Sequence, residues 1–387
     1  MSTLVPLFGL AHLFHHLIFA MLGPLWPAIR DQFGIDYTRF GFLLAAFGIA
    51  QGVSNLPWGW LADRIGQRVL VLAGISGVAL AGLMIGLAES YAMMLVGLIL
   101  LGIVSGAYHV AAVPIITRSV PPQKKGSALG LHMIGSSTCF LAAPLIAVAI
   151  AGVWTWRAPL IILSVPIFIF GIYLYVLLRR FPLADRQALE QKQGEGVEEP
   201  AKVFKWWSLL PFLTLSIVGV SFSQAPQSFL SLFLVDRYGA SQATVALFLT
   251  VISAGGLLAG PLGGYLSDRF GAPRVLLTGF LLCAPLIYLL NWVPFPLPML
   301  LAFLLISMVN YVRMPVTEMY IMNHAPERYR STMLGAYYFA GNEVLSAFTP
   351  VAGFMIDRLD FHMTFTILAA AVFLLVLVLS FWLLRKR

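Results

Sequence analysis

Five histidines in the N-terminal part of the chain have side chains that exchange protons and bind ions. His12, His15 and His16 lie in one apolar segment, and at about 100° per residue they share one face of a helix. His109 and His132 lie in two later apolar segments. Because imidazole changes charge near neutral pH, we expect the cluster to carry a proton or to contact an anionic solute. Neutral hydrogen bonds between helices, an interfacial place for His12 and metal binding are the alternatives; we predict no metal.

Three charged residues interrupt apolar segments of the C-terminal part. Arg313 and Glu318 are five positions apart and point in different directions around a helix. Arg313 is therefore predicted to pair with Glu343, which lies near the middle of its own segment. That pair would be either structural or a switch in which Glu343 exchanges Arg313 for a proton. Glu318 lies nearer the end of its segment and is a candidate for a gate.

Uncharged polar side chains in the same segments are candidates for the lining of a cavity. Each of them has an alternative role in hydrogen bonds between neighbouring helices. These candidates are Gln51, Asn55, Gln224, Gln227, Tyr337, Tyr338 and Asn342.

The composition places these residues in a membrane. Sixty per cent of the 387 residues are hydrophobic and 10% are charged, whereas soluble domains carry about 25% charged residues. A spanning helix needs roughly 20 apolar residues, and the sequence predicts an all-α membrane protein. Its twelve expected helices are 4–29, 40–61, 69–87, 91–117, 127–150, 157–180, 207–235, 242–265, 274–291, 297–322, 331–357 and 361–384.

The distribution of basic residues predicts the orientation. The net charge of +8 could indicate a nucleic-acid partner. Most of the 24 Lys and Arg residues, however, fall in loops that would share one face with both termini. That bias is typical of the cytoplasmic face of a multi-pass protein. We therefore predict cytoplasmic termini, a bacterial inner membrane and no nucleic-acid partner.

The chain carries an internal repeat. Gly59-Trp-Leu-Ala-Asp-Arg-Ile-Gly66 recurs 205 residues later as Gly264-Tyr-Leu-Ser-Asp-Arg-Phe-Gly271. The same offset relates Asp31 to Asp236, Gly34 to Gly239 and three pairs around a later loop. A polar stretch, 181–205, reads as a cytoplasmic linker. We predict two pseudo-symmetric six-helix bundles, 1–180 and 206–387.

The first copy of the repeat resembles the signature loop of the major facilitator superfamily, G-x-L-A-D-R-x-G-(R/K)-(R/K). Only Gln67 departs from it. The resemblance implies a loop that braces the cytoplasmic side of a transporter. Carried onto both copies, it assigns this gating role to Gly59, Asp63, Arg64, Gly66, Arg68, Gly264, Asp268, Arg269 and Gly271.

A weaker resemblance is to the fosmidomycin-resistance-like exporters. It rests on His109, on Arg118, on the small-residue segment 126–135 and on the histidine-bearing first segment followed by Leu25-Trp-Pro-Ala. Two marks of proton-driven drug antiporters are altered: Leu98 and Ile99 replace an arginine site, and Ala143-Pro144 replaces Gly-Pro.

These observations favour a secondary transporter that moves a small organic solute, anionic or neutral, by alternating access. Export coupled to protons is the prediction; proton symport uptake, lipid translocation and metal-ion transport are alternatives. A membrane sensor or assembly factor is the alternative outside transport. No phosphate-binding loop or catalytic constellation is present in the sequence, so we predict neither ATP use, nor an enzyme, nor a cofactor. We expect a monomer whose partners are the solute, protons and the lipid bilayer.

Overall fold

The computed structural model describes residues 4–181, 207, 209–326 and 329–385, without the side chains of Asp63, Ser331 and Arg385. Apart from Phe181, the predicted linker lies outside the described residues. The bundle boundaries at 180 and 206 therefore stay a prediction.

Long helices make up the described N-terminal half. Asp36 and Ser90 begin two of them by accepting hydrogen bonds from the backbone N–H groups of Arg39 (2.7 Å) and Met93 (3.2 Å). Such N-caps satisfy donors that a helix leaves unpaired. The helices are α1 (Leu4–Phe33), α2 (Tyr37–Ile65), α3 (Gln67–Gly86), α4 (Tyr91–Arg118), α5 (Lys125–Ala151) and α6 (Ala158–Arg179), with a 3-10 turn η1 (Pro122–Lys124) before α5.

The C-terminal half differs from the prediction at its first helix. The expected span 207–235 is two helices, α8 and α9, which meet at Phe229 with a bend of 43°. Pro226 precedes the break, and proline removes a helical hydrogen bond and crowds the preceding turn. The described helices are α8 (Leu210–Ser228), α9 (Leu230–Tyr238), α10 (Gln242–Phe270), α11 (Ala272–Leu289), α12 (Leu297–His324) and α13 (Arg330–Arg385).

The last helix, α13, contains two predicted spans. Asp360 has φ 68°, which breaks the helix, and its side chain accepts a bond of 2.9 Å from Met363 N to begin the second arm. Ten described helices are long and apolar enough to cross a membrane, and the bent pair α8–α9 adds an eleventh. With α13 divided at Asp360, the described residues form twelve spans, which confirms the predicted all-α fold.

The internal repeat is visible in the backbone. Gly34 and Gly239 have φ values of 59° and 61°, and Gly66 and Gly271 have 86° and 83°. Each pair lies at the 205-residue offset, and glycine adopts positive φ values more readily than other residues do. Equivalent turns in the two halves therefore have the same shape.

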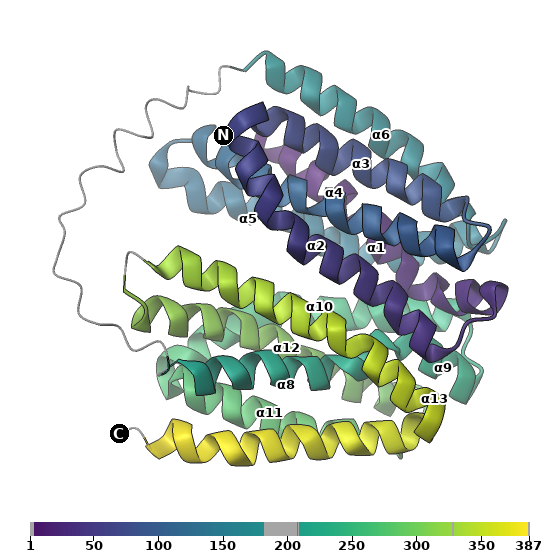
Figure 1. The fold of residues 1–387 in the computed structure, drawn as a ribbon, viewed down its shortest axis with the longest axis vertical. Helices are drawn as coiled ribbons and strands as arrows, with labels where there is room; N and C mark the ends of the chain where they lie inside the picture. The colour runs from purple at the N-terminus through teal and green to yellow at the C-terminus, as the bar shows by residue number, and fades with distance from the viewer. Residues whose placement is uncertain (1–3, 182–206, 208, 327–328, 386–387) are drawn as a thin grey trace.

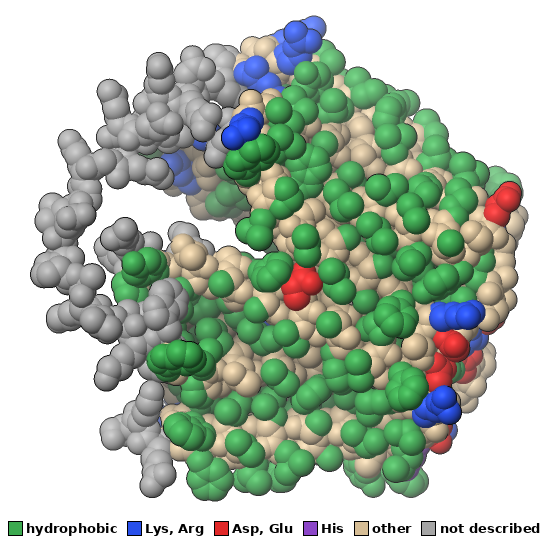
Figure 2. Space-filling view, viewed as in Figure 1, with side chains coloured by type: hydrophobic (Ala, Val, Ile, Leu, Met, Phe, Trp, Pro, Cys, Tyr) green, Lys and Arg blue, Asp and Glu red, His purple; other side chains and the backbone are tan. Residues whose placement is uncertain are grey.

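The two halves meet at one end of the molecule and part at the other. Figure 1 shows them converging near α9 and diverging toward the end where both termini lie. Figure 2 shows a notch between them at that diverging end, apolar side chains over much of this face, and charged groups mainly toward its edges. The contacts between halves are chiefly α2 with α13 and α5 with α10.

Close helix packing holds the α2–α13 contact. A Cβ added at Gly41 would lie 2.7 Å from Pro350 Cα, and one added at Gly353 would overlap the backbone of Tyr37. Without side chains at these positions the two backbones come together. The halves therefore meet through surfaces that separate only if whole helices move.

Candidate functional site

The five histidines form one cluster among α1, α4 and α5. The rings of His12 and His132 stack with centroids 4.0 Å apart, and His109 meets His15 edge-on at 4.7 Å. His16 lies 4.9 Å from His12. The structure thus brings together residues up to 120 positions apart in the sequence.

Backbone carbonyls determine the tautomers of three of these rings. Nδ1 of His12 lies 3.1 Å from the carbonyl oxygen of His132, and Nδ1 of His132 lies 3.0 Å from that of Phe8. His15 Nδ1 contacts the carbonyl of Gly74 at 3.3 Å. A carbonyl only accepts, so each Nδ1 carries the proton and, in the neutral ring, each Nε2 carries a lone pair.

Tyr108 was missed by the sequence analysis. It is fully buried, stacks on His15 at 4.7 Å and donates to the carbonyl of Phe8 at 3.1 Å. In the sequence, the position of Tyr108 directly before His109 could have indicated that it belongs to the cluster, because a buried tyrosine hydroxyl needs a hydrogen-bond partner.

Arg313 does not pair with Glu343, contrary to the expectation. Its guanidinium donates to Tyr337 Oη and to Ser216 Oγ (3.2 Å), and its Nε is buried with no hydrogen-bond partner. Arg313 therefore points from α12 toward a small polar group on α8 and the start of α13. The sequence places the two charges in neighbouring helices but does not say which faces those helices turn to each other.

Glu343 instead lies in the contact between α13 and α2. Its Oε1 is buried without a hydrogen-bond partner, and a Cβ added at Gly52 would overlap that oxygen. The next residue, Asn342, donates to the carbonyl of Gly48 at 2.7 Å across the same contact. The ion pairs found among the described residues involve Arg30 alone, so Glu343 has no cation there.

Other candidates fall into separate groups. Glu318 accepts a bond of 2.5 Å from Tyr338 Oη at an exposed place. Gln224 accepts from Asn310 at 3.0 Å, and Asn310 is a polar core residue that the sequence analysis did not single out. Gln227 Nε2 is buried with no hydrogen-bond partner.

The two candidates on α2 lie where this helix packs closely on α4 of the same half. Gly106 of α4 lies so close that an added Cβ would be 2.9 Å from Asn55 Oδ1. A Cβ added at Gly102 would lie 3.0 Å from the backbone nitrogen of Gln51. These positions contribute to the packing of α2 on α4.

The repeated loops lie at the parted end. Arg64 stacks on the ring of Trp60 at 3.8 Å, and Arg68 donates to the carbonyl of Phe181 at 2.6 Å. In the second copy Arg269 donates to Tyr265 at 2.9 Å. Asp268 and Gly271 line a cavity of about 560 Å³. The side chain of Asp63 lies outside the described residues.

Gly59 and Gly264, the first residues of the two repeated motifs, have open space beside them. Neither has any atom within 4 Å of an added Cβ. The halves are apart at this end, so these glycines are without neighbours in this conformation.

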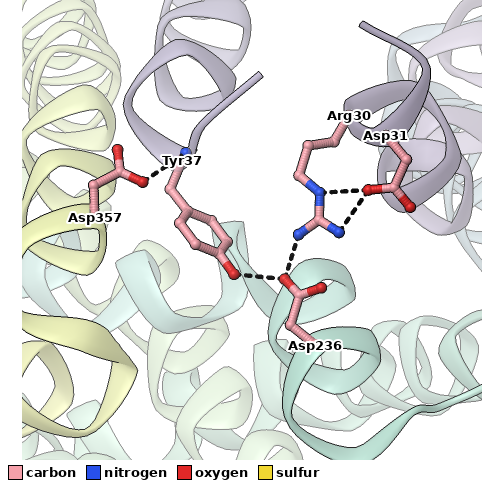
Figure 3. A network of polar contacts seen from close by, with 5 residues as sticks. All are labelled: Arg30, Asp31, Tyr37, Asp236 and Asp357. Carbon is pink, nitrogen blue, oxygen red and sulfur yellow. Dashed lines mark hydrogen bonds and ion pairs between the residues drawn. The ribbon is translucent and has the colours of Figure 1, made fainter. Parts of the chain in front are cut away.

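A polar cluster closes the opposite end. We call it the rim cluster: Arg30, Asp31, Tyr37, Asp236 and Asp357 (Figure 3). Arg30 of α1 binds Asp31 at 2.7 Å within its own half and Asp236 of α9 in the other half. Tyr37 Oη donates to Asp236 at 2.5 Å.

The rim cluster also caps a helix across the contact. Asp357 of α13 accepts from the backbone N–H groups of Tyr37 (3.0 Å) and Thr38 (2.8 Å) at the start of α2. A carboxylate at a helix N-terminus is stabilised by unpaired donors and by the helix dipole. The rim cluster therefore favours the conformation in which this end is closed.

Asp236→Asn is expected to weaken that closure. The variant loses a charge that contacts Arg30 and Tyr37 across the halves, worth about 1 kcal/mol or about fivefold in the ratio of closed to open states. Distances between spin labels on the exposed loop residues Val153 and Trp292 would measure the ratio. Asp31→Asn is the control, because Asp31 contacts Arg30 within one half. Equal distance changes in both variants would contradict the assignment.

Comparisons with known proteins agree with this architecture. The profile of the Major Facilitator Superfamily matches residues 8–236 and 212–387. Multidrug resistance protein MdtG of Klebsiella pneumoniae (strain 342) is 25% identical over 301 residues, which cover 74% of this chain and 71% of that protein. MdtG of Proteus mirabilis (strain HI4320) is 29% identical over 270 residues, covering 67% of this chain and 65% of that protein.

Solved structures share the fold. A bacterial homolog to the human lysosomal transporter Spinster, inward-facing and occupied, has a TM-score of 0.79 at 17% identity and covers 99% of this chain and 97% of its own. A POT family transporter in complex with 5-aminolevulinic acid has a TM-score of 0.82 at 14% identity, and the match covers 100% of this chain and 97% of that transporter. Because the superfamily profile matches from residue 8 to the C-terminus, this chain belongs to the Major Facilitator Superfamily and is a multi-pass membrane transporter of small molecules, not an enzyme.

Proposed function

We propose that this transporter exports small organic solutes in exchange for protons, from a bacterial inner membrane with both termini in the cytoplasm. The observation that carries the proposal is the carboxyl group of Glu343. It lies on a surface where the two halves must separate, and one of its oxygens is buried with no hydrogen-bond partner.

The position of Glu343 suits a coupling group. While α2 and α13 are packed together, a proton on the carboxyl group removes a charge that would have no cation beside it. When the helices separate, water reaches the carboxylate and the proton can leave. The protonation of Glu343 would then depend on which end of the transporter is open, and that dependence couples proton flow to the cycle.

The distribution of charges supports this orientation. Most basic residues lie toward the parted end, which we therefore assign to the cytoplasm. The rim cluster then closes the outer side, and the conformation described is inward-open. The repeated loops with Asp268 and Arg269 would meet across the cytoplasmic side in the opposite state, which is the gating role expected for them.

Two unpaired donors favour solutes that carry acceptor groups. Arg313 Nε and Gln227 Nε2 are both buried without hydrogen-bond partners. A carboxylate, phosphonate or carbonyl on the solute would satisfy such donors. Export is supported by the relatives, which carry the name multidrug resistance protein.

Transport in inverted membrane vesicles tests the proposal. Drugs and metabolites are presented with a pH gradient, with the gradient collapsed by nigericin, and to vesicles without the protein. We expect accumulation of at least one solute that disappears with nigericin, together with release of protons when that solute is added. Accumulation that persists without the gradient would exclude proton coupling.

A further inference from the structure

We propose that His12, His16 and His109 bind a divalent transition-metal ion such as Zn²⁺. The proposal does not rest on proton-coupled export, because none of these residues contacts Glu343 in the described structure. It assigns a ligand to a buried cluster that the proposed transport cycle does not use.

The distances fit a metal site. One ligand nitrogen from each of the three rings lies within 4.8 Å of the others. Nε2 of His12 and Nε2 of His16 are 3.1 Å apart. Zinc binds imidazole nitrogen at about 2.0–2.1 Å, which places two ligands of a tetrahedral site about 3.4 Å apart. Small side-chain movements therefore complete the site.

The tautomer of His12 leaves a lone pair that can bind a cation. His12 donates from Nδ1 to the carbonyl of His132, so its Nε2 presents a lone pair. The 3.1 Å contact then requires a proton on Nε2 of His16. A metal ion would take the place of that shared proton, and His16 would carry its own proton on Nδ1.

The surrounding groups hold the ligand rings in place. His132 stacks on His12 at 4.0 Å with an angle of 7° between the planes, and His15 packs against His109. His15 and His132 are themselves bonded to backbone carbonyls. Of the three proposed ligands, His12 has its other ring nitrogen bonded to a backbone carbonyl, an arrangement typical of metal-binding histidines because it fixes the ring orientation.

The ligand set selects the ion. Three neutral imidazoles suit Zn²⁺, Co²⁺ or Ni²⁺, whereas Mg²⁺ and Ca²⁺ require oxygen ligands. His12 is 2% exposed, whereas His16 and His109 keep part of their surfaces exposed. A fourth position remains for water or for an anionic group.

Calorimetric titration of the purified full chain with zinc chloride tests the proposal. We expect one ion per chain, and a loss of affinity of at least about tenfold in His109→Gln and in His16→Gln. His324→Gln is the matched control, because that exposed histidine of α12 lies outside the cluster and bonds to Tyr320. Unchanged affinity in both cluster variants, or no binding by the unmodified chain, would overturn the site.

The absorption spectrum of bound Co²⁺ tests the site even if the variants do not fold. Co²⁺ bound by three imidazoles in tetrahedral geometry absorbs strongly in the visible region, whereas octahedral Co²⁺ absorbs weakly. We expect the strong spectrum from the unmodified chain and its loss when zinc is added in competition. A weak, octahedral spectrum would contradict the site without any substitution.

Discussion

Glu343→Gln is expected to abolish accumulation of solute against a gradient. Glutamine keeps the size of the side chain but neither gains nor loses a proton, so it resembles the protonated form in every state. A pH gradient of one unit is worth about 1.4 kcal/mol per proton and supports about tenfold accumulation when one proton moves per solute. In inverted vesicles containing the variant, the ratio of internal to external solute concentration should be about one.

An assay of solute exchange distinguishes a loss of proton coupling from general damage to the protein. The neutral side chain leaves the packing of α13 on α2 intact, so exchange of labelled for unlabelled solute without a gradient should continue. Glu89→Gln is the control, since Glu89 is exposed in the loop between α3 and α4. Accumulation retained in Glu343→Gln would assign the proton to another residue, and loss of exchange would indicate a structural role.

Gly353→Val should hold the outer end open. An added side chain at Gly353 would overlap the backbone carbonyl of Tyr37, which belongs to the other half and cannot turn away as a flexible side chain would. Overpacking of this kind costs about 1–3 kcal/mol. The corresponding shift in population is about 5- to 150-fold toward the state in which α2 and α13 are apart.

Gly341→Val is the matched control for this second experiment. Gly341 lies on the same helix, and a Cβ added there has nothing within 4 Å. Spin labels at Val153 and Trp292 should report longer distances in Gly353→Val and unchanged ones in Gly341→Val. An unchanged distribution in Gly353→Val, in protein that remains monodisperse, would show that the contact is not the closing surface.

The sequence predicted the spans well because lipid imposes their length and composition. Its errors lie where a single residue changes the backbone locally. Proline also occurs inside α1 and α2 without dividing those helices, so Pro226 alone did not predict the break at Phe229. Asp360, by contrast, fell in the expected gap between 357 and 361, and the structure shows how it begins the final arm.

The candidate site was predictable to the extent that it depends on one helix face. His12, His15 and His16 were expected together from their spacing, and they do contact one another. The partner of Arg313 depends on the rotation of α12 against α8, which no spacing within one segment determines. Contacts between the halves, including the rim cluster, depend in addition on which conformation is populated.

The rim cluster has an unequal charge balance. Asp31 and Asp236 occupy equivalent places in the repeat, yet both bind the same arginine, and Asp31 belongs to the same half as Arg30. When the halves part, Arg30 keeps Asp31 as its counterion, whereas Asp236 loses the arginine. That carboxylate faces the medium, where dissolved cations screen it. The ionic strength of the medium would therefore affect the balance between the closed and open states of this end.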